Sequence, residues 1–320
     1  MQAREWKARD VKEAFFPVEM RPVYMPSPKV AQGYQELNRH LAVVDVERDH
    51  AFSVVTDEYQ LVTNQEAYER AAEVMKKVFQ VTKLGDLECL NLVMPQPRSF
   101  CHIDLIHRDA DFVPFEKDSW TAFLRITNSY NRTRKLHYEL GFCRWICLNG
   151  MIFGARSVEF SYAHTRRGID RSLRFEDNIG DIRKLEARLT EQLHQLKRYH
   201  VPQAEMLPLV CRAFDIRVPA DVATSSRRAD DLRSFREQIR ELTERYFSGM
   251  GMHGYAALNV LTDFASRPQG VLAPETRIHG FQQRTSTWME DFVQAIEKRE
   301  FSFDNYLADY RDTAKRLMAL

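Results

Sequence analysis

AFLRITNSYNRTRKLHYEL, residues 122–140, is the stretch of the chain that decides the fold. Residues 122–127 alternate apolar and polar side chains, and residues 135–140 alternate again. The seven residues between them, 128–134, are polar and rich in turn formers. Two alternating runs joined by such a turn predict an antiparallel hairpin. Further runs on both sides of it extend the prediction to a β-meander.

The chain before this hairpin predicts more strands and one helix. Short β-branched runs at 41–46 and 51–56 flank a polar tetrapeptide and predict another hairpin. Residues 87–94 and 100–106 are two further strand candidates. Asn64 is expected to cap a helix whose apolar positions are Ala67, Ala71, Ala72, Met75 and Phe79.

The chain after the hairpin contains one ambiguous segment. Residues 142–153 are densely apolar, and we interpret them as a buried helix, although periodicity alone does not distinguish such a run from a strand. Residues 158–164 alternate and are expected to return to the sheet. From residue 176 onward the pattern is helical, with apolar stripes such as Leu232, Phe235, Ile239, Leu242 and Tyr246.

These patterns predict an α+β protein with two parts. Residues 1–176 are expected to form an antiparallel β-meander with packed helices, and residues 181–320 a helical domain. The turn formers within 177–180 mark the predicted boundary. The stripe in 232–246 covers only two heptads, so we expect packing inside a bundle rather than a coiled-coil dimer.

Composition narrows the class of protein. The 320 residues carry a net charge of +1, with 44% hydrophobic and 28% charged residues, which is ordinary for a globular protein. The sequence contains no apolar run of about 18 residues, and a charged stretch starts it, so we predict a cytoplasmic protein without membrane contact. The five cysteines are odd in number and scattered, which favours buried, reduced thiols.

Local charge is far from neutral around the hairpin. Residues 119–174 contain ten Lys and Arg against three acidic residues, a local excess of about +7, interleaved with aromatic residues. Cations for phosphates and flat rings for bases are what a nucleic-acid groove requires. The alternative is that the strands place their Arg side chains on a solvated face and their aromatic side chains in the core.

Catalytic motifs are scarce in this chain. Nucleophile elbows, Walker A loops and dinucleotide glycine patterns are missing from the sequence. The string His102, Asp104, His107 invites a metal interpretation, but a strand would point His107 away from the other two. Asp104, Asp109 and Asp111 could serve a two-metal nuclease, although such acidic groups are common on surfaces. We therefore expect no metal and no cofactor.

A resemblance to a known family adds a further expectation. FSVVTDEYQLVTNQEAY, residues 52–68, resembles a strand, turn, strand and helix cap of the DUF932 family. Thr127-Asn128-Ser129, Arg144 to Asn149 and His164-Thr165 follow in the order found there. The resemblance covers about residues 40–167, and it departs at Tyr130-Asn131-Arg132, where the family often has a His-Asp-Gly turn. It implies an origin in phages, plasmids or prophages but no activity.

We therefore predict a non-catalytic DNA-binding protein that acts in replication, recombination or defence, with single strands as a candidate target. The phosphate-binding candidates are Arg132, Arg134, Lys135, Arg166 and Arg167, and the stacking candidates are Tyr130 and Trp145. We expect Arg144, Cys147 and Asn149 to be architectural, with Arg144 hydrogen-bonded if buried. The alternatives are the nuclease above and a protein-interaction module that binds a phage or host partner. A homo-oligomer is a further expectation.

Overall fold

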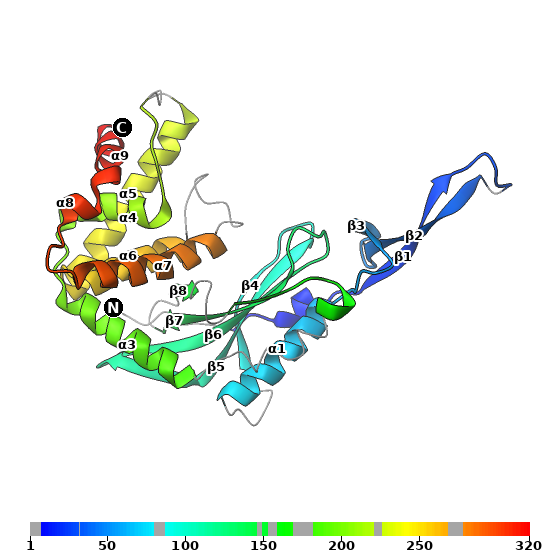
Figure 1. Ribbon diagram of the computed structural model, residues 1–320, viewed down its shortest axis with the longest axis horizontal. Helices are drawn as coiled ribbons and strands as arrows, with labels where there is room; N and C mark the ends of the chain where they lie inside the picture. Colours follow the sequence, from blue (N-terminus) through cyan, green and yellow to red (C-terminus); the bar gives the residue numbers. More distant parts are fainter. Residues whose placement is uncertain are drawn as a thin grey trace.

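The computed structural model describes residues 8–31, 33–79, 87–145, 149–152, 159–168, 182–220, 226–267 and 278–320. Its architecture is α+β, as predicted, with antiparallel sheets followed by a helical C-terminal half (Figure 1). The strands are β1 (Val18–Pro26), β2 (Tyr34–Asp45), β3 (His50–Thr56), β4 (Leu87–Val93), β5 (Phe100–Phe115), β6 (Asp118–Ser129), β7 (Leu136–Arg144), β8 (Asn149–Ile152) and β9 (Glu159–Tyr162). The helices are α1 (Asn64–Phe79), α3 (Ile182–Arg198), α4 (Met206–Phe214), α5 (Arg227–Met250), α6 (Gly254–Ser266), α7 (Ile278–Ile296), α8 (Phe303–Tyr306) and α9 (Ala308–Ala319).

The predicted hairpin lies at the centre of the larger sheet. Strands β4 to β8 follow one another in sequence order, and β9 pairs with β7 beside β8. The register of β6 and β7 runs from Trp120 opposite Arg144 to Thr127 opposite His137. The polar turn between them is held by Asn131, whose side-chain oxygen accepts from the Thr133 hydroxyl at 2.6 Å. The β-meander prediction is confirmed.

The helix predicted over residues 142–153 is wrong. β7 continues to Arg144, and β8 pairs with it, placing Asn149 opposite Arg144. The error has a physical cause, because seven consecutive residues of β7, from Tyr138 to Arg144, are buried. A strand buried on both faces shows no alternation between apolar and polar residues. Cys147 lies outside the described residues.

Helix α1 packs against β5 and β6 and closes one face of the sheet. The helix begins with a capping box: the Glu66 carboxylate accepts from the Thr63 N–H at 2.7 Å, and the Thr63 hydroxyl accepts from the Glu66 N–H at 3.1 Å. The cap is therefore Thr63 rather than Asn64. Asn64 is the first helical residue and is buried.

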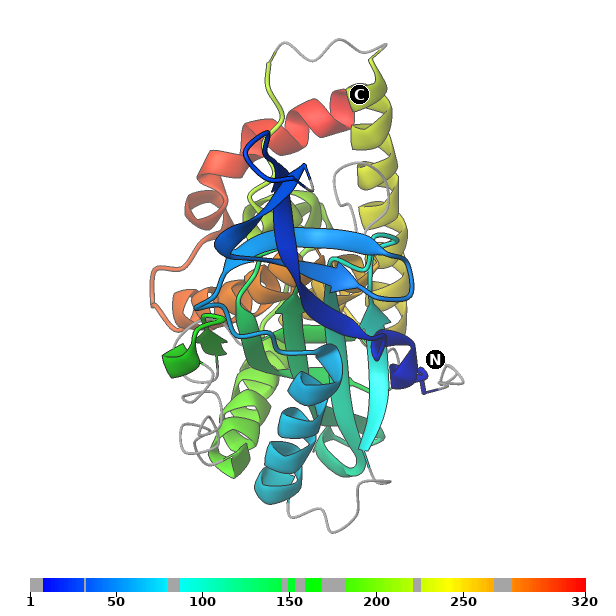
Figure 2. The ribbon, with the colours of Figure 1, turned by 90° about the vertical axis from the view of Figure 1, so that its right-hand side faces the viewer.

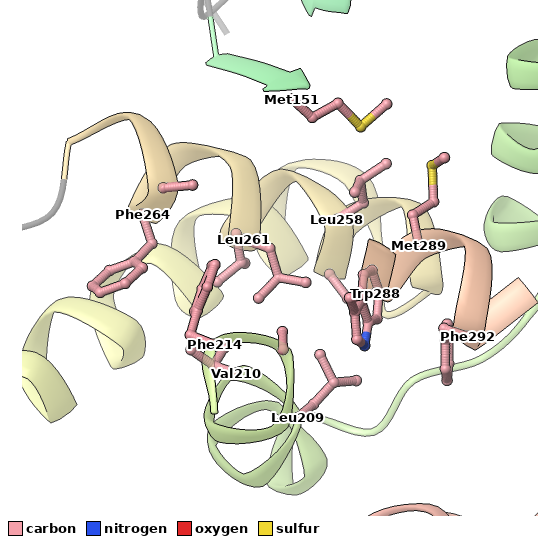
Figure 3. Packing of buried hydrophobic residues seen from close by; sticks show 14 of the residues in the cluster. Met151, Leu209, Val210, Phe214, Leu258, Leu261, Phe264, Trp288, Met289 and Phe292 are labelled. Carbon is pink, nitrogen blue, oxygen red and sulfur yellow. The ribbon is translucent and has the colours of Figure 1, made fainter. Parts of the chain in front are cut away.

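The C-terminal helices share a hydrophobic core with the sheet. Figure 3 shows Met151 of β8 facing Leu258 of α6 and Met289 of α7, and these residues belong to one buried cluster with Trp120 and Phe142. The five stripe residues of α5 are buried in the same cluster, as a bundle requires. The predicted boundary at 177–180 lies outside the described residues. None of the described helices is long and apolar enough to cross a membrane.

A two-stranded arm projects from the body (Figures 1 and 2). β3 pairs with β2 only from His40 to Asp45, so the outer part of the β1–β2 hairpin has no third strand. Large side chains at its tip are exposed: Tyr24 by 58%, Met25 by 47% and Tyr34 by 60%.

A buried ion pair between Arg144 and Asp118 holds the sheet to the helices. The Arg144 guanidinium donates to both carboxylate oxygens of Asp118, at 2.6 and 2.8 Å, and to Asn259 of α6 at 2.9 Å. The Tyr255 hydroxyl donates to the same carboxylate at 2.8 Å. The prediction that a buried Arg144 is hydrogen-bonded is confirmed, although the residue lies at the end of a strand.

Replacing Arg144 by Met should lower the free energy of unfolding by about 3–5 kcal/mol, because the Asp118 carboxylate stays buried without its cation. Urea denaturation measures this loss. The double variant Arg144→Met/Asp118→Leu should recover at least half of it, since no uncompensated charge is left. Equal stabilities of the single and double variants would contradict the pairing.

Candidate nucleic-acid interface

The ten Lys and Arg residues within 119–174, which we call the basic block, fall into distinct groups. Arg125 donates to both carboxylate oxygens of Asp104 at 2.6 Å and to Gln282 of α7 at 2.6 Å, and it is buried. Arg144 is neutralised in the same manner by Asp118. Neither residue contributes to a surface. Three others, Arg156, Arg171 and Arg174, lie outside the described residues.

The remaining five cations gather at one end of the sheet. Lys135 directly precedes β7, whose first residue, Leu136, pairs with Tyr162 at the end of β9. The chain after β9 then turns, and Thr165 forms a bridge with Tyr59. Arg132 and Thr165 line the same cleft, and Arg166 and Arg167 directly follow Thr165.

Four of these five side chains are exposed. Within the described part of the chain, Arg132, Lys135, Arg166 and Arg167 form no ion pair. Arg134 differs, because it is half-buried with its guanidinium 4.5 Å from the centre of the Phe100 ring. Burial lowers the pKa of Arg134. We therefore assign the four exposed cations to the candidate interface and a packing role to Arg134.

The two predicted stacking residues do not join this site. Tyr130 is fully buried, its hydroxyl accepts from the Asn64 N–H at 2.8 Å, and its ring stacks on Phe52. Tyr130 therefore offers no face to a base, and that prediction is corrected. Trp145 directly follows the other end of β7, about 30 Å from Lys135 at about 3.4 Å per residue. It is half-buried and packs against the buried cluster of Ile106, Phe123 and Cys143.

A polar cleft lies between the β6–β7 turn, which contributes Arg132, and the segment after β9, which contributes His164 and Thr165. It has a volume of about 360 Å³. The rings of Tyr59 and His164 stack in its wall, with centroids 5.1 Å apart and planes inclined by 12°. His164 also places Nδ1 3.2 Å from the Gln60 carbonyl oxygen. The residues that line the cleft are His40, Val54, Val55, Thr56, Glu58, Tyr59, Arg132, His164 and Thr165.

Two buried polar atoms of residues that line this cleft have no hydrogen-bond partner in the described part of the chain. The Tyr59 hydroxyl and His164 Nε2 are shielded from solvent and make no hydrogen bond to any described residue. Burial raises the pKa of Tyr59 to about 12, against the opposing charge of Arg132. Burial lowers the pKa of His164, and the Gln60 hydrogen bond opposes this only in part. Both side chains are therefore neutral at pH 7. Buried polar atoms are normally satisfied, so these two are exceptions within the described part of the chain.

Only an indirect signal in the sequence points to this pair. Both residues fall within stretches that carry the family resemblance, but they are 105 positions apart and no motif joins them. The signature residues next to Tyr130 are structural. Asn128 donates to the Val62 carbonyl at 2.8 Å and to Asn64 at 3.0 Å, which fixes the segment that leads from the cleft into α1.

The acidic residues considered for a nuclease do not form a described site. Asp104 is committed to Arg125, whereas Asp111 is exposed. Their partners on β6, Arg125 and Thr121, are four residues apart, which separates the two carboxylates by about 13 Å along the sheet. The side chain of Asp109 lies outside the description. No described group of three His, Cys, Asp or Glu could hold a metal ion. Cys89, Cys101, Cys143 and Cys211 are buried free thiols, as predicted.

Replacing Tyr59 by Phe should leave the free energy of unfolding unchanged or raise it, because the hydroxyl removed has no described partner. Tyr130→Phe is the matched control and should cost about 1–3 kcal/mol, since it leaves the Asn64 N–H buried and unsatisfied. Urea denaturation compares the two. A loss at Tyr59 as large as that at Tyr130 would show that the Tyr59 hydroxyl has a structural partner.

Comparison with known proteins adds a family but no activity. A family profile described as "Domain of unknown function (DUF932)" matches residues 51–289. The match extends well beyond residue 167, where the resemblance ends, and includes helices α3 to α6 and the first part of α7. No curated protein and no solved structure matches the chain. The matched residues, from β3 into α7, make up most of the chain. The chain therefore belongs to the DUF932 family.

Proposed function

We propose that this protein binds DNA without catalysis, and that it does so through Arg132, Lys135, Arg166 and Arg167. The observation that carries the proposal is their arrangement: the four exposed cations, unpaired among the described residues, belong to two segments that meet at one cleft, which Arg132 and Thr165 line. The buried cations of residues 119–174, Arg125 and Arg144, are neutralised in pairs, so among the described cations of this stretch the free charge lies mainly in these four. Phosphates are the ligand that such a cluster of Lys and Arg suits best.

Single strands are the form of DNA that we propose. A cleft of about 360 Å³ is at the lower end of the range of about 300–1,000 Å³ for small-ligand sites, which favours a single unpaired nucleotide over a base pair. The proposed setting is replication, recombination or defence in a phage, plasmid or prophage, inside the cytoplasm. The family resemblance supports this setting.

The DNA-binding test is a variant with Arg132, Lys135, Arg166 and Arg167 all changed to Ala. We expect affinity for a 20-nucleotide oligo-dT to fall by at least tenfold. If all four side chains bind phosphates, the slope of log affinity against log salt should decrease by about 3, because each cation removed lowers it by about 0.7. Fluorescence anisotropy between 50 and 300 mM NaCl measures both quantities.

A charge-matched control separates direct phosphate binding from the effect of net charge. Arg227, Arg228, Lys298 and Arg299 are four exposed cations of the helical half, and changing them to Ala removes the same charge. This control should keep the wild-type salt slope. If both quadruple variants bind oligo-dT equally well, the four cations near the cleft are solvated surface residues and the proposal fails.

The arm favours a second candidate function, a protein-interaction module that includes self-association. Tyr24 lies opposite Glu36 and Pro26 opposite Tyr34, so both tyrosines occupy one face of the hairpin, and Met25 occupies the other. Exposed aromatic and methionine side chains are enriched at protein interfaces. An isolated two-stranded hairpin is only marginally stable in water, which favours a partner for the arm.

Changing Tyr24, Met25 and Tyr34 to Ser tests this second function. If the arm joins copies of the chain, the wild type should be oligomeric in light scattering after gel filtration, and the triple variant monomeric. The body should melt at an unchanged temperature, because these side chains are exposed. A monomeric wild type would restrict the arm to a different partner protein.

A further inference from the structure

We infer that a pocket in the helical half binds a small amphiphilic anion, with an apolar tail inside the pocket and its negative head group beside Lys315. The pocket has a volume of about 680 Å³, well within the range of about 300–1,000 Å³ for small-ligand sites. It shares none of its described lining residues with the polar cleft, so this inference does not depend on DNA binding.

Three helices and one short turn enclose the pocket. α4, α5 and α9 pack against one another (Figure 1), and the 3-10 turn Gln203–Glu205 leads directly into α4. Met206 of α4 and Ile239 of α5 are almost fully buried, so they lie at the bottom of the pocket. Leu207 is half-buried and Met318 of α9 is 68% exposed, so apolar surface in the pocket is open to a ligand.

This apolar surface favours a ligand with a hydrocarbon tail. Each methylene group that a ligand buries strengthens its binding by about fourfold, because the group leaves water. The methionines at the bottom and the rim of the pocket, Met206 and Met318, have unbranched, flexible side chains that adapt to tails of different shape. The pocket therefore suits a class of tails rather than one rigid molecule.

The charges around the pocket favour an anion. Four of the five charged residues that line it are cations: Arg236, Arg240, Arg311 and Lys315. The fifth is Glu237. The other acidic partners of these cations lie outside the described lining: Glu205, Glu244, Asp304 and Asp312. The lining thus carries an excess of positive charge, to which a negative head group is complementary.

Lys315 is the cation most available to that head group. Arg236, Arg240 and Arg311 each form an ion pair of 3.1 Å or less. The one described ion pair of Lys315, with Asp312, is 3.5 Å long, and its side chains are 78% and 77% exposed. Exposed pairs of this kind contribute little, so the Lys315 ammonium can turn from Asp312 to a ligand.

The test uses decanoate with the full-length protein and isothermal titration calorimetry at pH 7.5. Wild-type protein should bind decanoate at one site, at least tenfold more tightly than butanoate, because the longer tail buries more methylene groups. Decyltrimethylammonium has the same tail and the opposite charge, and it should bind at least tenfold more weakly than decanoate. No saturable binding of decanoate, or equal binding of the two charges, would overturn the inference.

Two variants at exposed positions locate the site. Met318→Ser removes apolar surface, and Lys315→Glu reverses the charge beside the head group; each should weaken decanoate binding by at least threefold. Lys315→Glu should also strengthen binding of decyltrimethylammonium, a gain that damage to the fold would not produce. The matched control is Lys298→Glu, an equal change of charge at an exposed residue outside the lining, and it should bind decanoate like the wild type. Decanoate binding that is unchanged in both pocket variants would refute this site.

Two further comparisons complete the experiment. Decyl phosphate has the tail of decanoate and a phosphate in place of the carboxylate, so the tighter of the two ligands identifies the head group that the pocket prefers. The variant with Arg132, Lys135, Arg166 and Arg167 changed to Ala should keep wild-type affinity for decanoate. A loss of decanoate binding in that variant would place the anion at the candidate interface and overturn the inference, whatever the result with oligo-dT.

Discussion

Burial of two arginines inside the sheet is the constraint on which the rest of the structure depends. Desolvating a guanidinium is costly unless a carboxylate and further polar groups replace its water. Asp104 and Asp118 supply the carboxylates, and α6 and α7 supply Asn259 and Gln282. The sheet therefore requires the helices, and in the described residues the two halves of the chain form one packed body.

This constraint explains which parts of the fold can be predicted from the sequence. Local periodicity of apolar residues is sufficient to predict the hairpin at 122–140, the earlier strands and the C-terminal helices. Residues 142–153 resemble a helix because β7 is buried on both faces, and double burial removes the alternation that identifies a strand. The composition of that strand reflects the helices packed on it, and these helices come from a distant part of the chain.

The candidate site shows the same limit more strongly. The basic block is evident in composition, but composition does not separate Arg125 and Arg144, which are buried in ion pairs, from Arg132, which is exposed. Tyr130 adjoins the cations in sequence, which favours a stacking role, yet its hydroxyl is tied to the first residue of α1. Tyr59 and His164 meet only through a bridge between distant segments, so their pairing depends on the tertiary structure.

The arm has a consequence for solubility. Both strands of its outer part are open edges, which are templates for uncontrolled strand addition and aggregation. β1 carries Pro22 and Pro26, and proline has no N–H with which to extend a ladder. The backbone also shifts register between Pro22 and Tyr24, which breaks the flat edge that an added strand would need. The arm is thus protected against sheet growth along β1, while its side-chain faces remain open to a chosen partner.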